Sequence, residues 1–340
     1  MGAALSSLLS EVQDKGQEGC MGQVDLNSAS AALDLLSSTG MVARVELRLS
    51  ARGLPKKDKL SQSDPMAVLY RAAATGQTQW AEAGRTNVVA NMSDPEWVKP
   101  ILERYTADAA QPMKVVIYDV DSIAKKPEAL SLASQDYIGE VEFALSDLMK
   151  APGGTLELPL VDLQQGRALP PGCVVVFKAE PMSSSDNRVI RFAFAATGLM
   201  GKVGPATPAL RISRLRQGSQ DDWVPVARTE VRDKNSDPVW QPMEIDIRQL
   251  CSADEARPLK LEVWDWSSKG THVLLGEHRT TLAQLKELGG GSTGSAAKML
   301  DLSLPGGGSA TGRLMLRQCM VKPGPTASQN LAGCLQGCLG

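Results

Sequence analysis

An internal duplication constrains the fold of this chain more than any other feature of its sequence. The pattern Arg-Thr, then Asp-Pro, then Trp occurs twice, and a single offset without a gap aligns the two occurrences. Two further segments, one with an aromatic-Asp pair and one with Gly-Glu, repeat in the same order. The matched pairs are residues 85–97 with 228–240, 118–122 with 264–268, and 138–140 with 275–277. Three matches in one order indicate two copies of one structural unit.

Both copies have the residue pattern of β-strands. Val45, Leu47 and Leu49 alternate with charged residues, and the same period of two recurs around Leu261 and Leu314. This period places one strand face on a core and the other in water. The 31 glycines and 20 prolines favour turns between such strands. We therefore predict an all-β protein with two tandem antiparallel β-sandwiches. The sandwiches are expected at 41–180 and 187–322, and flexible segments at 1–40 and 323–340.

Charge and cysteine usage exclude several classes of protein. The 36 basic and 38 acidic residues give a net charge of −2, which argues against binding nucleic acid by bulk charge. No apolar run is long enough to span a membrane, and the N-terminus lacks the basic region of a secretory signal. The six cysteines form no CxxC pair, so a disulfide scaffold or zinc site is not expected. These features indicate a reducing, cytosolic compartment.

No catalytic site is predicted. The segment 289–295 matches both GxSxG and GxGxxG, but it lies in a Gly/Ser loop without the strand–turn–helix setting that either motif requires. The two histidines, His272 and His278, have no triad-like surroundings in the sequence. We therefore expect a non-enzyme.

Several motifs together resemble C2 domains, and their tandem arrangement resembles the copine family over roughly residues 42 to 321. The matching motifs are Ser63-Asp64-Pro65, Arg85-Thr86 with Asp94-Pro95, Tyr118-Asp119-Val120-Asp121-Ser122, Gln135-Asp136-Tyr137-Ile138-Gly139, Asn235 to Pro242, and Gly312 to Cys319. The resemblance implies two eight-stranded C2-type sandwiches. Copines continue into a von Willebrand A-like domain, whereas only a short segment follows residue 322 here. Partner-binding functions of that domain are therefore not expected.

In C2 domains, two loops at one end of the sandwich supply carboxylates to Ca²⁺, a hard cation that takes six to eight oxygen ligands. All five of the family positions are acidic in the first copy: Asp58, Asp64, Asp119, Asp121 and Asp136. We expect these residues to bind Ca²⁺ at a membrane surface. The alternative is that they are ordinary turn aspartates. An EF-hand is excluded, because Leu130 occupies the twelfth position counted from Asp119.

The loop between Asp121 and Asp136 spans residues 122–135 and is longer than the usual C2 third loop. The position of Asp136 therefore depends on how this loop folds back. Lys125 and Lys126 in the loop are candidates for contacts with lipid phosphates. A solvated loop explains them equally well.

The second copy has lost most of the acidic set. Its corresponding residues are Gly201, Thr207, Asp265, Ser267 and Val273. With one carboxylate of five, this copy is expected to be Ca²⁺-independent and to contact lipids or proteins by other faces. A phosphoinositide patch is one hypothesis, and the polar face of a sandwich is the other. The candidate basic residues are Arg211, Arg214, Arg216 and Arg228.

The N-terminal sequence Met1 to Ser6 fits the N-myristoylation pattern, with Gly2 as the acylated residue. One myristoyl chain binds a membrane weakly, so a Ca²⁺-driven C2 domain would supply the second signal. We expect a cytoplasmic protein bound peripherally to anionic phospholipids on the cytosolic face, in particular at the plasma membrane. The second C2 domain is expected to add protein contacts. The alternative is a Ca²⁺-insensitive interaction scaffold in which both C2 domains bind proteins.

Overall fold

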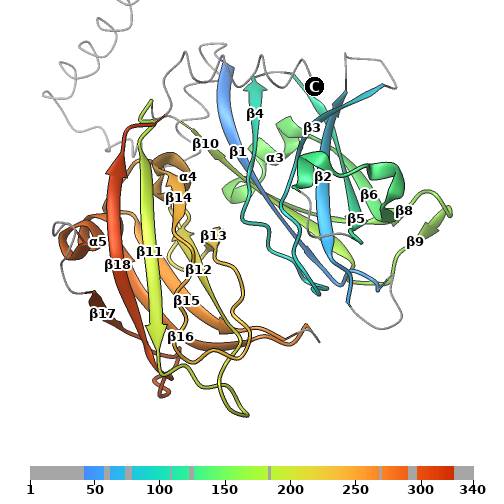
Figure 1. The fold of residues 1–340 in the computed structure, drawn as a ribbon. Helices are drawn as coiled ribbons and strands as arrows, with labels where there is room; N and C mark the ends of the chain where they lie inside the picture. The colour runs from blue at the N-terminus through green and yellow to red at the C-terminus, as the bar shows by residue number, and fades with distance from the viewer. Residues whose placement is uncertain are drawn as a thin grey trace, which may run out of the picture.

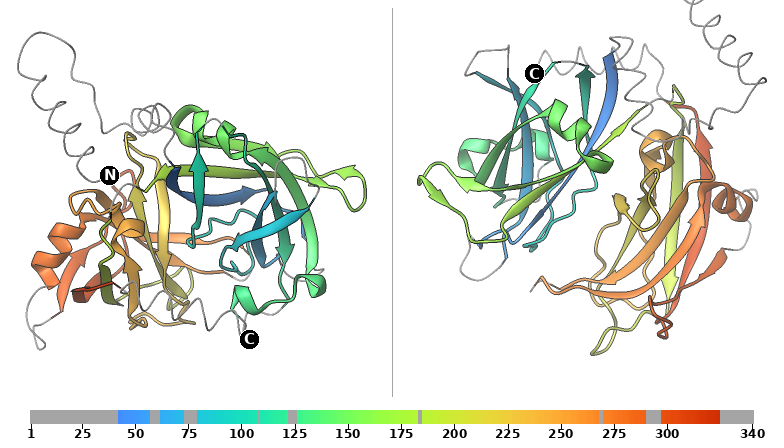
Figure 2. Two further views of the ribbon diagram at one scale, coloured as in Figure 1. Left: turned by 90° about the horizontal axis from the view of Figure 1, so that it is seen from above. Right: turned by 180° about the vertical axis from the view of Figure 1, so that it is seen from behind.

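The structure is a computed structural model that describes residues 42–56, 62–72, 79–107, 109–121, 126–182, 185–267, 270–289 and 297–324. Two β-sandwiches lie side by side, the first in blue and green and the second in yellow to red (Figure 1). The other two views show the same pair (Figure 2). The predictions for Gly2, Asp58 and Lys125 lie outside the described residues.

Two sheets form the first sandwich in the described part of the chain. One sheet has four strands, in the order β4 (Ile101–Thr106), β1 (Val42–Arg52), β10 (Val174–Pro181) and β7 (Thr155–Pro159). The other has six, in the order β3 (Trp80–Arg85), β2 (Pro65–Ala72), β5 (Pro112–Asp119), β6 (Asp136–Ala144), β8 (Val161–Asp162) and β9 (Arg167–Ala168). All strand pairs are antiparallel. The two-residue strands β8 and β9 extend an otherwise eight-stranded sandwich.

The second sandwich repeats this topology. One sheet has the order β14 (Met243–Asp246), β11 (Val189–Thr197), β18 (Arg313–Lys322) and β17 (Lys298–Asp301). The other has the order β13 (Trp223–Arg228), β12 (Pro208–Leu215), β15 (Pro258–Asp265) and β16 (Val273–Thr281). The predicted eight-stranded antiparallel sandwich is confirmed here.

Short helices connect some of the strands. Asp246 caps helix α4 by accepting a hydrogen bond from the backbone N–H of Arg248, which satisfies one of the donors left free at a helix start. The α-helices are α3 (Leu145–Lys150), α4 (Ile247–Cys251) and α5 (Leu282–Gly289). The 3₁₀ helices are η2 (Pro127–Ala129), η3 (Leu132–Ser134) and η4 (Pro152–Gly154).

The repeated sequence motifs make the same contacts in both sandwiches. Trp97 and Trp240 are buried, and their indole N–H groups donate to the carbonyls of Pro65 and Pro208, at 3.0 and 3.4 Å. Burial of a large aromatic side chain with a satisfied N–H stabilises a core strongly. The duplication is therefore a structural one.

The threonine of the repeated Arg-Thr motif also makes the same contact in both sandwiches. The Thr86 hydroxyl accepts from the Ala67 N–H at 3.0 Å, and the Thr229 hydroxyl accepts from the Leu210 N–H at 2.9 Å. These bonds pair buried backbone donors within each sandwich, which explains why the same Arg-Thr motif occurs in both copies.

Strand β1 does not have the water-exposed face that its alternating sequence predicts. Val45, Leu47 and Leu49 face the core of the first sandwich, as predicted. The intervening Glu46 and Arg48 are also buried, with only 2% and 4% of their surface exposed. They are not in water because the second sandwich covers this face, as the bond from the Arg48 guanidinium to the carbonyl of Pro225 shows (2.7 Å).

Candidate metal centre

Strand pairing gathers three of the predicted aspartates at one end of the first sandwich. Asp119, the last residue of β5, lies opposite Asp136 of β6. It also lies opposite Pro65 of β2, next to Asp64. The backbone N–H of Asp64 donates to Oδ1 of Asp119 at 2.6 Å. Side chains directly opposite on neighbouring strands lie close together, so the register alone places these carboxylates at a common edge.

Each carboxylate has a distinct setting. Asp119 is buried and Asp64 is half-buried, and Oδ1 of Asp64 accepts from the Asn91 N–H at 2.7 Å. Asp121 and Asp136 are exposed. Two carboxylates are thus oriented by the backbone, and two face solvent.

The long third loop folds back onto the sandwich rather than displacing Asp136. Its residue Leu130 is buried against Met66 and Val68. The Arg85 guanidinium donates to the carbonyls of Pro127 and Leu130, at 2.9 and 2.7 Å. The loop's last residues are therefore fixed, and Asp136 stays in register with Asp119 although a bulge lies between Ile117 and Tyr118.

The donor chemistry of this edge fits Ca²⁺, which prefers carboxylate oxygens. Within the described residues, however, no group of three or more His, Cys, Asp or Glu side chains is close enough to hold a metal ion. Asp58 lies outside those residues. Asp64, Asp119, Asp121 and Asp136 therefore share an edge without forming a closed coordination shell.

The second sandwich keeps the backbone frame of this edge and changes the side chains. The Thr207 N–H donates to Oδ1 of Asp265 at 2.7 Å, as Asp64 does to Asp119. The Lys234 N–H donates to the Thr207 hydroxyl at 3.2 Å, where the first copy has Asn91 and Asp64. The frame thus persists although Asp265 is the one acid left at the matched positions.

The third-loop contact is also repeated with different chemistry. In the first copy the Asp121 N–H donates to Oε1 of Gln135 at 3.3 Å. In the second, the Ser267 N–H donates to Nδ1 of His272 at 3.0 Å. The His272 ring stacks on Trp266, with centroids 3.7 Å apart. In the second copy, the stacked rings of Trp266 and His272 therefore hold the two sides of the third loop together.

The absence of a side chain at Gly201 also leaves room for Asp265. A Cβ atom built at Gly201 would lie 2.5 Å from Oδ2 of Asp265. Replacing Gly201 with Asp is therefore expected to displace the Asp265 carboxylate, to destabilise the second sandwich by about 1 kcal/mol, and not to restore a Ca²⁺ site. Urea unfolding of the variant with and without Ca²⁺ checks both points. Lys202→Asp, one residue along the same loop and exposed, is the control. Stabilisation of Gly201→Asp by Ca²⁺ would contradict the prediction.

The predicted basic patch of the second copy does not lie on an exposed surface. Arg214 and Arg216 are buried between the two sandwiches, with 1% and 8% of their surface exposed. Arg211 and Arg228 are half-buried. Strand β12 faces the first sandwich, so Arg211 and Arg214 pair with carboxylates there.

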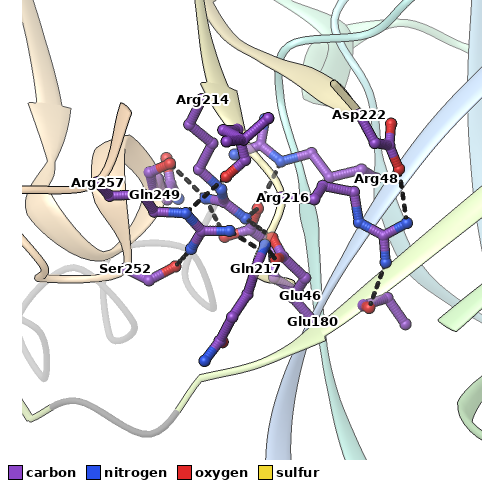
Figure 3. A network of polar contacts seen from close by, with 12 residues as sticks. Glu46, Arg48, Glu180, Arg214, Arg216, Gln217, Asp222, Gln249, Ser252 and Arg257 are labelled. Atoms are coloured by element: carbon purple, nitrogen blue, oxygen red, sulfur yellow. Dashed lines mark hydrogen bonds and ion pairs between the residues drawn. The ribbon is translucent and has the colours of Figure 1, made fainter. Parts of the chain in front are cut away.

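A buried ion network joins the two sandwiches (Figure 3). The Arg214 guanidinium donates to Glu46 at 2.9 Å and also to Glu180, both from the first sandwich. Arg257 donates to Glu180 at 2.7 Å. Burial opposes ionisation of Glu180, but these two guanidiniums outweigh it and lower the pKa of its carboxyl to about 2. The network therefore holds its charges at neutral pH.

Glu46, Glu180 and Arg257 were not expected to have a role. A signal for Glu46 was present, because its neighbours in β1 alternate regularly and it carries a charge on the outer face. Nothing in the sequence identified the partner of that charge, since Glu46 and Arg214 are 168 residues apart.

Comparison with protein families agrees with this architecture. The C2 domain model matches residues 44–160 and 192–295, which together are more than half of the chain. The chain belongs to the C2 domain family. Its two C2 domains correspond to the two sandwiches, so the expected fold is confirmed.

This tandem C2 protein is related to the BONZAI proteins. It is 29% identical over 301 residues to Protein BONZAI 1 of Arabidopsis thaliana, covering 86% of this chain and 50% of that protein. It is 29% identical over 274 residues to Protein BONZAI 2, covering 79% of this chain and 45% of that protein. The chain thus spans about half the length of these curated relatives.

Solved structures of C2 domains are also similar. One is titled BON1-C2B, with 23% identity, a TM-score of 0.35, and coverage of 41% of this chain and 99% of that one. Another is the calcium-bound pair of C2 domains of Extended-Synaptotagmin 2, with 15% identity, a TM-score of 0.30, and coverage of 83% and 98%.

Proposed function

We propose that this protein is a copine-like, Ca²⁺-dependent phospholipid-binding protein whose first C2 domain carries the only Ca²⁺ site of the pair. The observation that supports this most is the contrast between two equivalent edges. Both keep the same backbone hydrogen bonds, but only the first has acids at all matched positions. Hydrogen-bonding alone therefore does not explain why the first edge is acidic.

Asp64, Asp119, Asp121 and Asp136 would hold the ion together with Asp58. Bound Ca²⁺ would supply positive charge that cancels the mutual repulsion of the carboxylates and attracts anionic head groups. The backbone bonds to Asp64 and Asp119 preorganise two of the acids, and the exposed Asp121 and Asp136 face the side from which a membrane would approach.

Two further features fit peripheral attachment. Lys126 is exposed where the described part of the third loop begins, and with Lys125 it would contact lipid phosphates. Myristate on Gly2 would add a weak anchor. No helix within the described residues is long and apolar enough to cross a bilayer. We propose a cytoplasmic location, peripheral to the plasma membrane.

Vesicle co-sedimentation tests the proposal. Wild-type protein should pellet with phosphatidylserine-containing vesicles in Ca²⁺ and stay in solution with EGTA. Asp119→Asn with Asp121→Asn removes two charges from the site, so the Ca²⁺ midpoint should rise at least about tenfold, which is about 1.4 kcal/mol of binding free energy. Asp121→Asn alone alters only an exposed side chain and should shift the midpoint in the same direction.

Asp265→Asn is the matched control, because Asp265 occupies in the second copy the place of Asp119. It should leave pelleting unchanged. If the Asp119/Asp121 variant is folded by circular dichroism and pellets like the wild type in Ca²⁺, the proposed site is wrong. Ca²⁺-insensitive binding to proteins would then be the better description.

A further inference from the structure

A groove of about 260 Å³ lies between the two C2 domains. The first domain contributes Met92 and Glu96 to its wall, and the second contributes Arg228, Trp264, Trp266 and His272. At ~30 Å³ per water molecule, this volume corresponds to about nine waters. The groove therefore suits a small molecule. It borders the acidic edge, because Met92 in its wall follows Asn91, whose N–H donates to Asp64.

Arg228 is a half-buried cation that has no acceptor for its guanidinium N–H groups among the described residues. Its contact is with the face of Trp266, 4.8 Å from the ring centroid. The nearby Arg211 is already paired with Glu262 at 2.9 Å and with Glu96 at 2.5 Å. Burial and the Arg211 charge lower the pKa of Arg228 to about 10. A shielded cation without a counter-ion is costly, and a bound anion would offset that cost.

Two other donors in the wall lack acceptors. Nε1 of Trp264 and Nε2 of His272 are buried and have no hydrogen-bond partner in the part of the chain that the structure describes. His272 accepts from Ser267 through Nδ1, so its proton is assigned to Nε2, which makes that nitrogen a donor. Burial and Arg228 lower the pKa of His272 to about 4, and the ring is therefore neutral at pH 7.

Arg228 determines the chemistry of a ligand, because the nitrogens of Trp264 and His272 have no exposed surface in the groove. The guanidinium donates, so the ligand must supply acceptors. The site has one unpaired positive charge, and the acids Asp94 and Glu96 in the facing wall disfavour a polyanion. Met92 and Val98 offer apolar surface.

We propose that the interdomain groove binds a small, singly charged organic carboxylate. Its carboxylate pairs with Arg228, and its apolar part lies against Met92 and Val98. A guanidinium stacked on an aromatic ring is a common partner for a carboxylate because its fork of N–H groups binds both oxygens.

The test is calorimetric titration of the full chain with four probes: acetate, hexanoate, benzoate and indole-3-carboxylate. At least one should bind saturably, with a Kd on the order of 1 mM or tighter. Benzamide and hexanamide, which keep the shape and lose the charge, should bind at least about tenfold more weakly. Tryptophan fluorescence should change with the same midpoint, since two of the six tryptophans line the groove.

Arg228→Gln should weaken carboxylate binding at least about tenfold without unfolding the protein, because it removes an unpaired charge. Arg279→Gln is the matched control: Arg279 also stacks on a tryptophan, Trp223, at 5.5 Å, but lies outside the groove. It should bind like the wild type.

Several outcomes would overturn the proposal: failure of all four carboxylates to bind, equal binding of the amides, or unchanged binding by Arg228→Gln. Inorganic phosphate and vesicles containing phosphatidylinositol 4-phosphate form separate arms. Tighter Arg228-dependent binding in either arm would assign the groove to a phosphate ligand instead. All arms are run in EGTA, so the result does not depend on the Ca²⁺ site.

Discussion

Arg214→Met is expected to destabilise the protein by about 3–5 kcal/mol, because it breaks two ion pairs that are buried between the domains. Arg214 is 1% exposed, and its loss would leave Glu46 paired with Arg48 alone and Glu180 paired with Arg257 alone. Urea unfolding followed by circular dichroism and tryptophan fluorescence measures the change.

The matched control is Arg52→Met. Arg52 also pairs with a glutamate, Glu157, but those two side chains are 56% and 50% exposed, and such pairs contribute about 0–1 kcal/mol. Adding Glu46→Gln and Glu180→Gln to Arg214→Met should not recover the lost stability, because the buried Arg48 and Arg257 would then lose their carboxylate partners. Equal losses for Arg214→Met and Arg52→Met would show that the network contributes little.

The same network gives a pH dependence with a defined sign. The pKa of Glu180 is lowered from 4.5 to about 2 in the folded protein. The stabilisation from this group is therefore fully present above about pH 5 and is lost as the pH falls toward 2. In Arg214→Met the loss should begin at higher pH, since one of the two guanidiniums that hold the pKa down is absent.

Trp97→Ala is the second large expected effect, with a loss of about 3–5 kcal/mol. Trp97 is fully buried in the first sandwich, and truncation would leave a cavity and remove one of the two donors to the Pro65 carbonyl, which also accepts from the Val89 N–H. Trp97→Phe keeps most of the volume and loses one hydrogen bond, so a smaller loss of about 0.5–1.5 kcal/mol is expected. Chemical denaturation measures both.

Leu163→Ala is the control, since Leu163 is exposed in the same domain, and its effect should stay within about 0.5 kcal/mol. Trp240→Ala should resemble Trp97→Ala, because Trp240 makes the equivalent bond to Pro208. A small effect for Trp97→Ala would mean that the repeated tryptophan is not central to the sandwich.

Much of the fold could be predicted because the duplication and the period of two are local patterns. Trp97 and Trp240 could be matched by sequence alone, and their identical bonds confirm the match. Strand pairing then places Asp64, Asp119 and Asp136 together. Their role in binding Ca²⁺ stays a prediction.

The contact between the domains could not be predicted, because alternation identifies a polar face without saying what covers it. Glu46 and Arg214 look like solvent-facing charges in the sequence, and each is buried by the other's domain. The same limit applies to Arg228. Its unpaired state depends on Arg211 using the nearby carboxylates, which only three-dimensional placement reveals.

The short connection between the domains has a thermodynamic consequence. Only seven residues separate Pro181 at the end of β10 from Val189 at the start of β11. Both ends are fastened, since the Met182 N–H donates to the Arg44 carbonyl at 2.8 Å and Arg188 pairs with Glu255 at 3.2 Å. A short tether gives its two modules an effective concentration in the millimolar range. An interface too weak to join two separate C2 domains would therefore still hold these two together, and its charges would meet in one orientation.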